Sequence, residues 1–156
     1  MMRPLTDEQE KTWMVARIIA VALGLAGPAL YLVIASFIRP NQALADTPRG
    51  GHYALLFYII LTMAILGPLV VPIVERVQVN TWRLGAKRPP ERMYLSLVVL
   101  RLAFVEASFI YGFVVYLLTY DFLRLVLFYP IGLIWLAIYW PKRGKYEQFI
   151  QMGEVR

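Results

Sequence analysis

The chain has 156 residues, of which 60% are hydrophobic, and 16 lysines and arginines against 10 aspartates and glutamates give it a formal net charge of +6. A soluble domain of this size rarely exceeds about half apolar residues, so the composition predicts a protein whose surface faces lipid. Cysteine is absent and histidine occurs once, at His52. These counts exclude a disulfide framework, a cysteine nucleophile and a histidine-rich metal site within one chain, and we expect no cofactor. The basic residues lie in loops and at chain ends, which is typical of membrane topology and not of nucleic-acid binding.

Four apolar runs are long enough to cross a bilayer, which takes about 20 helical residues. They cover about residues 13–38, 53–74, 95–120 and 122–140. The predicted fold is all-α: a polytopic membrane protein with four transmembrane helices in an antiparallel bundle. Residues 1–156 would then form a single membrane domain.

The first apolar run follows a polar start in which Thr6 and Gln9 have capping-box spacing. A helix that begins there can run directly into the span, and the acidic start without a small-residue cleavage site argues against a signal peptide. Arg17 lies about one turn inside the span and can extend back to the membrane surface. We expect Pro28 to kink this helix.

The second run follows a loop over residues 39–52 and contains Pro68 and Pro72 in its later half, where each proline removes a backbone hydrogen bond. His52 is best interpreted as an interfacial loop histidine, with a proton relay as the alternative. Glu75 follows the run as an interfacial charge, and a basic loop is expected over residues 76–93. A very short connection joins the third and fourth runs, and the polar tail suits a short surface helix.

The distribution of lysine and arginine predicts the orientation, because cytoplasmic loops carry an excess of both. With the N-terminus inside, twelve basic residues fall on the inner side and three on the outer side, at Arg39, Arg49 and Arg124. Trp82 and Tyr94 have the positions of interface anchors. We therefore expect both termini in the cytoplasm, and a bacterial cytoplasmic (inner) membrane as the location.

One carboxylate, Glu106, lies close to the middle of the third run. An ionised acid at that depth costs roughly 2 kcal/mol or more, so a chain that keeps one uses it or neutralises it against a partner. A buried carboxyl can hold a proton at neutral pH and release it when a cation or a water path arrives. Tyr111 is a candidate donor to this carboxyl from a neighbouring helix or chain, and Arg101 is a candidate charge partner. The pattern leaves two roles open for Glu106, a proton relay and a carboxyl that fastens this helix to another.

Two stretches resemble a known family. Residues 100–117 read LRLAFVEASFIYGFVVYL, and the preceding residues 85–91 read GAKRPPE. They resemble the carboxylate-bearing outer helix and the polar loop of the proteolipid c subunit of rotary F-type ATP synthases, over about residues 53–118 in all. The whole chain also resembles small uncharacterised four-span bacterial membrane proteins with such a third helix, which implies a fold and no activity.

The resemblance implies a role for particular residues. Glu106 matches the proton-carrying carboxylate of the family, and Tyr111 matches the tyrosine that follows it. Ala107 stands where sodium-binding members have a hydroxyl, so the resemblance implies a proton as the ion. The positions that match the loop meeting the rotor stalk are Arg88, Pro90 and Glu91.

The second run has one glycine, Gly67, where the family's inner helix has a dense glycine repeat, and two further spans are added. Two functions therefore stay open: a c-like membrane protein that binds or relays a proton at Glu106, and a non-catalytic structural or assembly subunit of a larger membrane complex. An enzyme is disfavoured, because the sequence has no phosphate loop, zinc-binding histidine pair or serine elbow. The expected partners are the lipid bilayer and either other membrane subunits or further copies of the chain.

Overall fold

The structure, a computed structural model, describes residues 5–38, 52–85 and 89–154, and all of its regular secondary structure is helical. Four helical segments are long and apolar enough to cross a membrane, which confirms the predicted fold class. We call them the first to fourth spans. They are Asp7–Phe37, Ala54–Trp82, Pro90–Thr119 and Phe122–Tyr139.

The first span consists of α1 (Asp7–Val21), the π-helical turn η1 (Ala22–Ala26) and α2 (Gly27–Phe37). Its start is the capping box expected from the sequence: the Thr6 hydroxyl accepts the N–H of Gln9 at 3.4 Å, and the Gln9 side chain accepts the N–H of Thr6 at 3.1 Å. These two bonds satisfy amide groups that the helix itself leaves unpaired.

The first span widens where the sequence predicted a kink at Pro28. In η1 the N–H of Gly27 bonds to the carbonyl of Ala22, five residues earlier. Pro28 has no N–H to give to the carbonyl four residues before it, so the backbone cannot continue the regular α-helical pattern at this point. The widened turn takes up this defect.

The second span consists of α4 (His52–Leu66), the 3₁₀ turn η2 (Gly67–Val70) and α5 (Val71–Gly85). Pro68 cannot donate to the carbonyl of Ala64, and this carbonyl accepts the hydroxyl of Ser108 at 3.2 Å. Pro72 likewise leaves the carbonyl of Pro68, which accepts a tyrosine hydroxyl from the fourth span at 2.7 Å. Polar side chains of neighbouring helices thus replace the bonds that the prolines remove.

The loop between the second and third spans is shorter than the predicted 76–93. Helix α5 continues to Gly85 and α6 begins at Pro90. The sequence change from apolar to charged marks the end of the apolar stretch, not the end of the helix, because arginine and glutamine are good helix formers. Trp82, expected as an interface anchor, is buried and stacks on Phe149 with ring centroids 5.6 Å apart.

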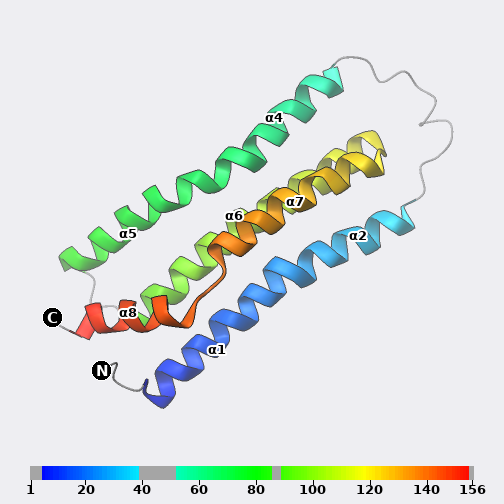
Figure 1. Ribbon diagram of the computed structural model, residues 1–156. Helices are drawn as coiled ribbons and strands as arrows, with labels where there is room; N and C mark the ends of the chain where they lie inside the picture. The colour runs from blue at the N-terminus through cyan, green and yellow to red at the C-terminus, as the bar shows by residue number, and fades with distance from the viewer. Residues whose placement is uncertain (1–4, 39–51, 86–88, 155–156) are drawn as a thin grey trace.

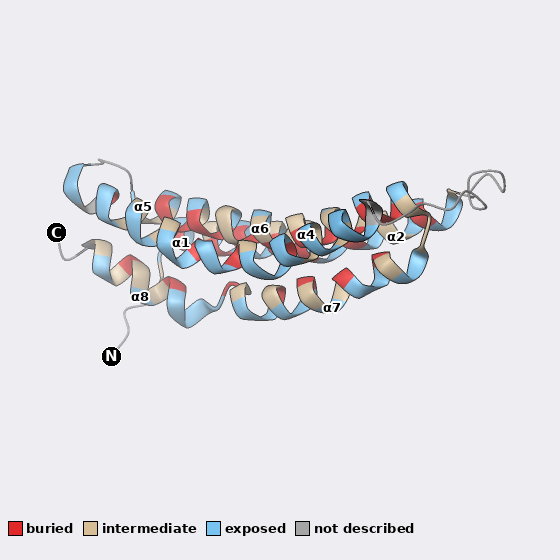
Figure 2. Cartoon of the chain, turned by 90° about the horizontal axis from the view of Figure 1, so that it is seen from above, coloured by how far each residue is buried: buried red, intermediate tan, exposed pale blue. Residues whose placement is uncertain are grey.

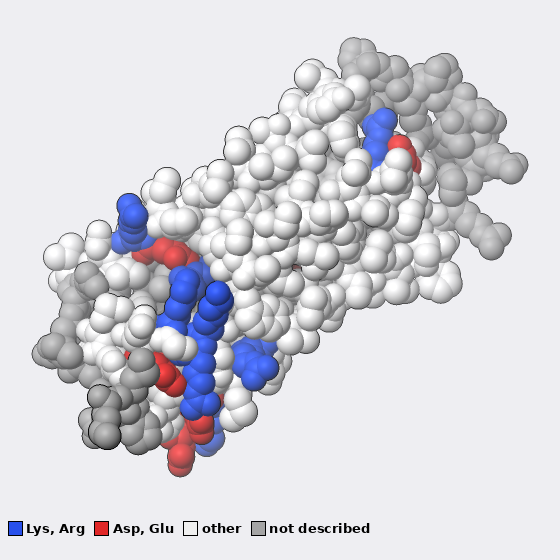
Figure 3. Space-filling model, viewed as in Figure 1, with Lys and Arg blue, Asp and Glu red and all other residues white. Residues whose placement is uncertain are grey.

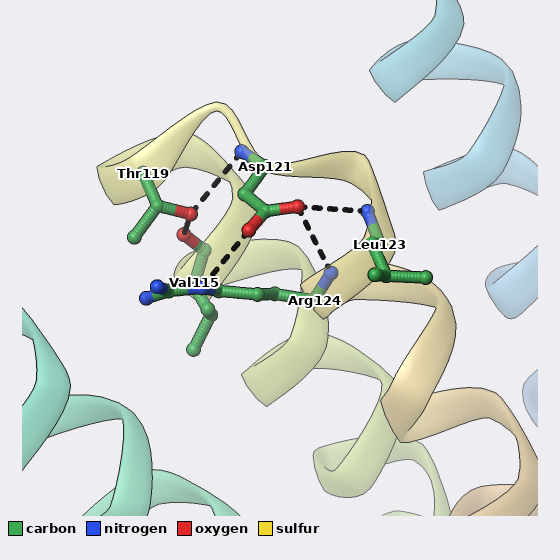
Figure 4. Close-up of polar contacts among 5 residues, drawn as sticks. All are labelled: Val115, Thr119, Asp121, Leu123 and Arg124. Atoms are coloured by element: carbon green, nitrogen blue, oxygen red, sulfur yellow. Dashed lines mark hydrogen bonds and ion pairs between the residues drawn. The ribbon is translucent and has the colours of Figure 1, made fainter.

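The third and fourth spans, α6 (Pro90–Thr119) and α7 (Phe122–Tyr139), form a tight antiparallel hairpin. Figure 4 shows the turn between them, where Asp121 accepts the N–H groups of Leu123 at 3.0 Å and Arg124 at 3.4 Å. The guanidinium of Arg124 donates back to the same carboxylate at 3.0 Å. Tyr120 ends α6 in the left-handed region with a φ of 53°.

The hairpin lies at the centre of the molecule. Figure 1 shows α6 and α7 between the first span on one side and the second span on the other, with both chain ends at the same end of the bundle. Seen from above, α7 and the predicted surface helix α8 (Arg143–Glu154) lie beneath a layer made by the first span, α6 and the second span (Figure 2). On its other side α6 carries exposed apolar side chains, among them Val99, Ile110 and Val114.

Charged side chains gather at the two ends of the bundle. Figure 3 shows lysines and arginines gathered at the end with the termini, a basic and an acidic side chain side by side toward the other end, and an almost entirely uncharged surface between them. This distribution fits a protein that crosses a membrane along its long axis. Glu106 belongs to the helix that runs through the middle of this uncharged region.

Candidate functional site

The carboxyl of Glu106 faces the first span. Its Oε1 accepts the hydroxyl of Tyr31 at 2.9 Å, and the side chain is half-buried. A Cβ added at Gly27 would lie 3.0 Å from the same oxygen. A larger residue at position 27 would therefore press on the carboxyl, so a glycine at this point lets the first span close over Glu106.

The π turn and an aromatic pair position Tyr31. The ring of Tyr31 lies one helical turn beyond Gly27 and stacks on Phe113 of α6, with ring centroids 5.5 Å apart. Next to it, the hydroxyl of Tyr129 on α7 donates to the carbonyl of Pro28 at 2.6 Å. Three spans thus meet near the carboxyl of Glu106. Ring stacking and the neighbouring hydrogen bond hold Tyr31, whose hydroxyl is the donor, in one orientation.

Arg101 has a partner of its own. Its guanidinium makes a two-pronged ion pair with Glu75 of α5, from Nε to Oε1 and from Nη2 to Oε2, the second at 3.0 Å. The two side chains are 19% and 18% exposed. On α6, five residues separate Arg101 from Glu106, which places them on different flanks of the helix. In the structure the partner of Arg101 therefore comes from the second span, and Glu75 is half-buried in this ion pair.

Further polar groups lie near this ion pair. Tyr94 and Tyr139 are within electrostatic range of both Glu75 and Arg101. The hydroxyl of Tyr94 and the Oε1 of Gln78 are buried and accept or donate no hydrogen bond to any described residue. Buried polar atoms of this kind are usually satisfied by ordered water. Tyr94, expected as an interface anchor, is buried against other helices at 3% exposure.

The structure does not bring Tyr111 to Glu106. The tyrosine ring packs on the opposite flank of α6, against a cluster made by Ala64 of the second span and by Val115 and Phe128 of the hairpin. Five residues along an α-helix turn a side chain by about 140°, so the two side chains diverge within one chain. The hydroxyl bound to the carboxyl is that of Tyr31, which the sequence did not single out.

The positions that resemble the stalk-facing loop are distributed differently from the expectation. Arg88 lies outside the described residues. Pro90 is the first residue of α6, and a Cβ added at Gly153 of α8 would lie 2.7 Å from its side chain. Glu91 accepts the side-chain amide of Gln9 at 3.2 Å. Pro90 and Glu91 therefore pack against other helices of the same chain.

Two residues of the site escaped sequence reasoning for different reasons. Tyr31 bonds across 75 positions of the chain, and a single apolar helix gives no signal that one of its tyrosines faces an acid. Glu75 stands at the edge of the apolar stretch, where an interfacial position is the simplest interpretation. Gly24, Gly27 and Tyr31 recur at helical spacing, and this pattern indicates a face of the first span that another helix can approach closely.

Among the described residues, no three histidine, aspartate or glutamate side chains come together as a metal site. No protein-family model matches the chain, and neither a curated protein nor a solved structure matches it. The chemistry available at Glu106 therefore follows from the geometry of this chain alone.

Proposed function

We propose that the protein is an integral membrane protein that binds a proton at Glu106, in a site closed by its own first span. The hydrogen bond from Tyr31 to Glu106 Oε1 at 2.9 Å carries this proposal. Within the described residues Glu106 has no ion pair, and Arg101 is already committed to Glu75. An acid in apolar surroundings without a cation is cheaper to keep protonated than ionised.

The site divides the two carboxyl oxygens between two tasks. Oε1 accepts from Tyr31, which leaves Oε2 to carry the proton. When the proton leaves, the Tyr31 hydroxyl still donates to the carboxylate, and a hydrogen bond to an ionised acceptor is stronger than one to a neutral acceptor. Tyr31 therefore lowers the cost of releasing the proton without moving the helices. The resemblance of the surrounding α6 sequence to proteolipid c subunits supports the same role.

The proposal includes an orientation. The end of the bundle that holds both termini also carries most of the basic side chains, as Figure 3 shows. Cytoplasmic segments carry this excess in membrane proteins. We accordingly place both termini in the cytoplasm and the protein in a bacterial cytoplasmic membrane.

Carbodiimide labelling tests the proton site. A hydrophobic carbodiimide reacts with protonated carboxyls inside the membrane, so Glu106 should be labelled in native membranes and Glu106→Gln should abolish the label. Glu75, whose carboxyl is paired with the guanidinium of Arg101, is the internal control and should stay unlabelled. Peptide mass spectrometry identifies the modified residue. Absence of label on Glu106 in native membranes would overturn the proposal.

The second candidate function is that of a structural or assembly subunit, in which the same hydrogen bond fastens the first span to α6. This role is favoured by the closure of Glu106 with a tyrosine of its own chain. Two substitutions separate the roles. Glu106→Gln keeps an oxygen acceptor for Tyr31 but cannot titrate, and Tyr31→Phe removes the bond but keeps the acid.

A proton site predicts that Glu106→Gln loses labelling and proton-dependent behaviour while the melting temperature stays close to that of the wild type. A fastening role predicts instead that Tyr31→Phe lowers the melting temperature, because it removes the bond between the first span and α6. In that case Glu106→Gln leaves proton permeability unchanged. Hydrogen bonds between membrane helices contribute about 0.6 kcal/mol on average, so the expected loss of stability for Tyr31→Phe is of that order.

A further inference from the structure

The outer flank of the first span is hollowed. A groove of about 570 Å³ runs along α1 and η1 on the side that faces away from Glu106. Its walls are apolar except for one guanidinium. The lining residues are Met14, Arg17, Ile18, Val21, Ala22 and Ala26.

The hollow follows from side-chain size around the π turn. Ala22 and Ala26 lie at the two ends of η1 and are exposed, whereas Ile18 and Val21 stand out from α1 at 67% and 47% exposure. The side chains of Ile18 and Val21 form the wall of the groove, and the two alanines form its floor. From Met14 to Ala26 the groove extends twelve residues, or roughly 18 Å at helical rise.

Arg17 lies in the half of this groove that is nearer to the chain termini. Its side chain is exposed and forms no ion pair or hydrogen bond with any residue that the structure describes. Two other arginines of the spans have carboxylate partners, Arg101 with Glu75 and Arg124 with Asp121. Helical side chains lean toward the N-terminus, so the Arg17 guanidinium points to the membrane surface at the end that holds the termini.

An unpaired cation beside an apolar groove complements a phospholipid with an anionic headgroup, because the cation matches the headgroup and the groove matches an acyl chain. We propose that this groove holds one acyl chain of such a lipid while Arg17 binds its headgroup phosphate. Arginine suits this contact because its planar guanidinium can donate two parallel hydrogen bonds to a phosphate. The site is independent of the proton bound at Glu106, although the two share the π turn, whose inner side holds Gly27 against the acid.

Lipid retention tests the site. The full chain is purified in mild detergent, mixed with equal amounts of phosphatidylglycerol and phosphatidylcholine of identical acyl chains, and examined by native mass spectrometry. We expect the wild type to retain phosphatidylglycerol several-fold better than phosphatidylcholine. Arg17→Gln should remove that preference, and Arg17→Lys should keep part of it.

Two further variants complete the experiment. Ala26→Leu fills the groove and should reduce retention of both lipids, since the acyl chain loses its place whatever the headgroup. Arg76→Gln removes an exposed cation that does not line the groove and should retain lipid as the wild type does. Equal retention of the two lipids by the wild type, or an equal loss for Arg17→Gln and Arg76→Gln, would overturn the proposal. Carbodiimide labelling of Glu106 in the same variants should be unchanged, which separates this test from that of the proton site.

Discussion

Tyrosine hydroxyls satisfy backbone carbonyls at several irregular points of this bundle. Tyr139 donates to Pro68 at 2.7 Å, Tyr129 to Pro28 at 2.6 Å, and Tyr116 to the end of α2 at Ala35 and Ile38. In a membrane core no water replaces a missing bond, so an unsatisfied carbonyl is costly. Tyr31 also lies between two helices, but its hydroxyl donates to a side-chain carboxyl and not to a backbone carbonyl. This difference singles out Glu106 among the polar groups of the spans.

The small size of two glycines allows the two hairpin helices to approach each other closely. A Cβ added at Gly112 of α6 would lie 2.7 Å from the Cβ of Phe128, and one at Gly132 of α7 would lie 2.4 Å from the ring of Phe109. The obstacle at Gly112 is an atom next to the backbone, which cannot swing away as a side-chain tip can. The two helices must therefore separate if a methyl group is added there.

We predict that Gly112→Ala destabilises the protein by about 1–3 kcal/mol, the range found for overpacked cores, even though alanine is the better helix former. Thermal unfolding in detergent, followed by tryptophan fluorescence, measures the effect. Gly67→Ala is the matched control, because a Cβ at Gly67 would meet nothing within 4 Å. Equal melting temperatures for the two variants would show that the close approach does not matter.

The place of Glu106 within a long apolar helix could be predicted from the sequence, but its partner could not. The sequence alone shows an acid in the middle of an apolar run, and in the structure this acid lies in a helix that is long and apolar enough to cross a membrane. Which flank of α6 meets which span depends on packing between segments that are distant in the chain. Arg101 illustrates the limit: its spacing to Glu106 is known from the sequence, yet its partner Glu75 comes from a different helix.

At the scale of the elements, the backbone accommodates the prolines of two spans with two different kinds of turn. Pro28 follows a turn that is widened to a π-helix, and Pro68 lies in a turn that is tightened to a 3₁₀ helix. The second span has two prolines four residues apart, so the carbonyls of Ala64 and Pro68 lose their usual donors there. The sequence predicted a disturbance at each place. It could not predict the kind, because the choice depends on which neighbouring side chains reach the free carbonyls.

The turn between α6 and α7 is held by a single acidic cap, as Figure 4 shows. The carboxylate of Asp121 accepts two backbone N–H groups of α7 and the guanidinium of Arg124. We predict that Asp121→Ala lowers stability by about 1 kcal/mol, the usual cost of losing an N-cap. Asp121→Asn keeps the cap and loses only the exposed ion pair, so it should cost less than half of that.

Chemical or thermal unfolding of the two variants, each measured against the wild type, gives the comparison. A loss for Asp121→Asn as large as that for Asp121→Ala would assign the stability of the turn to the ion pair instead of the cap. Thr119 supports the same turn, because its hydroxyl accepts the N–H of Asp121 at 3.2 Å. Its contribution is unchanged in both variants.

At the scale of the whole molecule, α8 fastens the end that carries the termini. The side chain of Tyr146 is fully buried, stacks on Trp13 with ring centroids 5.8 Å apart, and donates to the carbonyl of Gln9 at 2.8 Å. Arg143 forms ion pairs with Glu10 and, within α8, with Glu147. The sequence suggested a surface helix at this position, but its attachment to α1 required the coordinates.

This attachment should fail at high pH. Burial, with a smaller contribution from the charge of Glu91, raises the pKa of Tyr146 from 10.0 to about 12. A group whose folded pKa is raised contributes its full stabilisation below the unfolded value and loses it as the pH rises to the folded value. The hydroxyl of Tyr146 should therefore stabilise the protein up to about pH 10 and cease to do so between about pH 10 and pH 12.

Comparison of the wild type with Tyr146→Phe measures this contribution. The phenylalanine keeps the ring and lacks the titrating group, so the difference in melting temperature between the two proteins should be constant at neutral pH and shrink above pH 10. Phenolate absorbance of the wild type, read on the same samples, reports the titration. A difference that stays constant through pH 12 would show that the pKa of Tyr146 is the same in the folded and the unfolded state.

The π turn has a consequence for chain length. It accommodates one residue more than an α-helical turn, so removing a single residue between positions 22 and 26 would leave the number of residues that an α-helical turn takes. All side chains before the turn would then rotate by about 100° relative to Tyr31. Trp13 and Arg17 would lose their present directions while Tyr31 stayed beside Glu106. The one extra residue of the π turn thus sets the directions in which the side chains of α1 point relative to Tyr31, which faces Glu106.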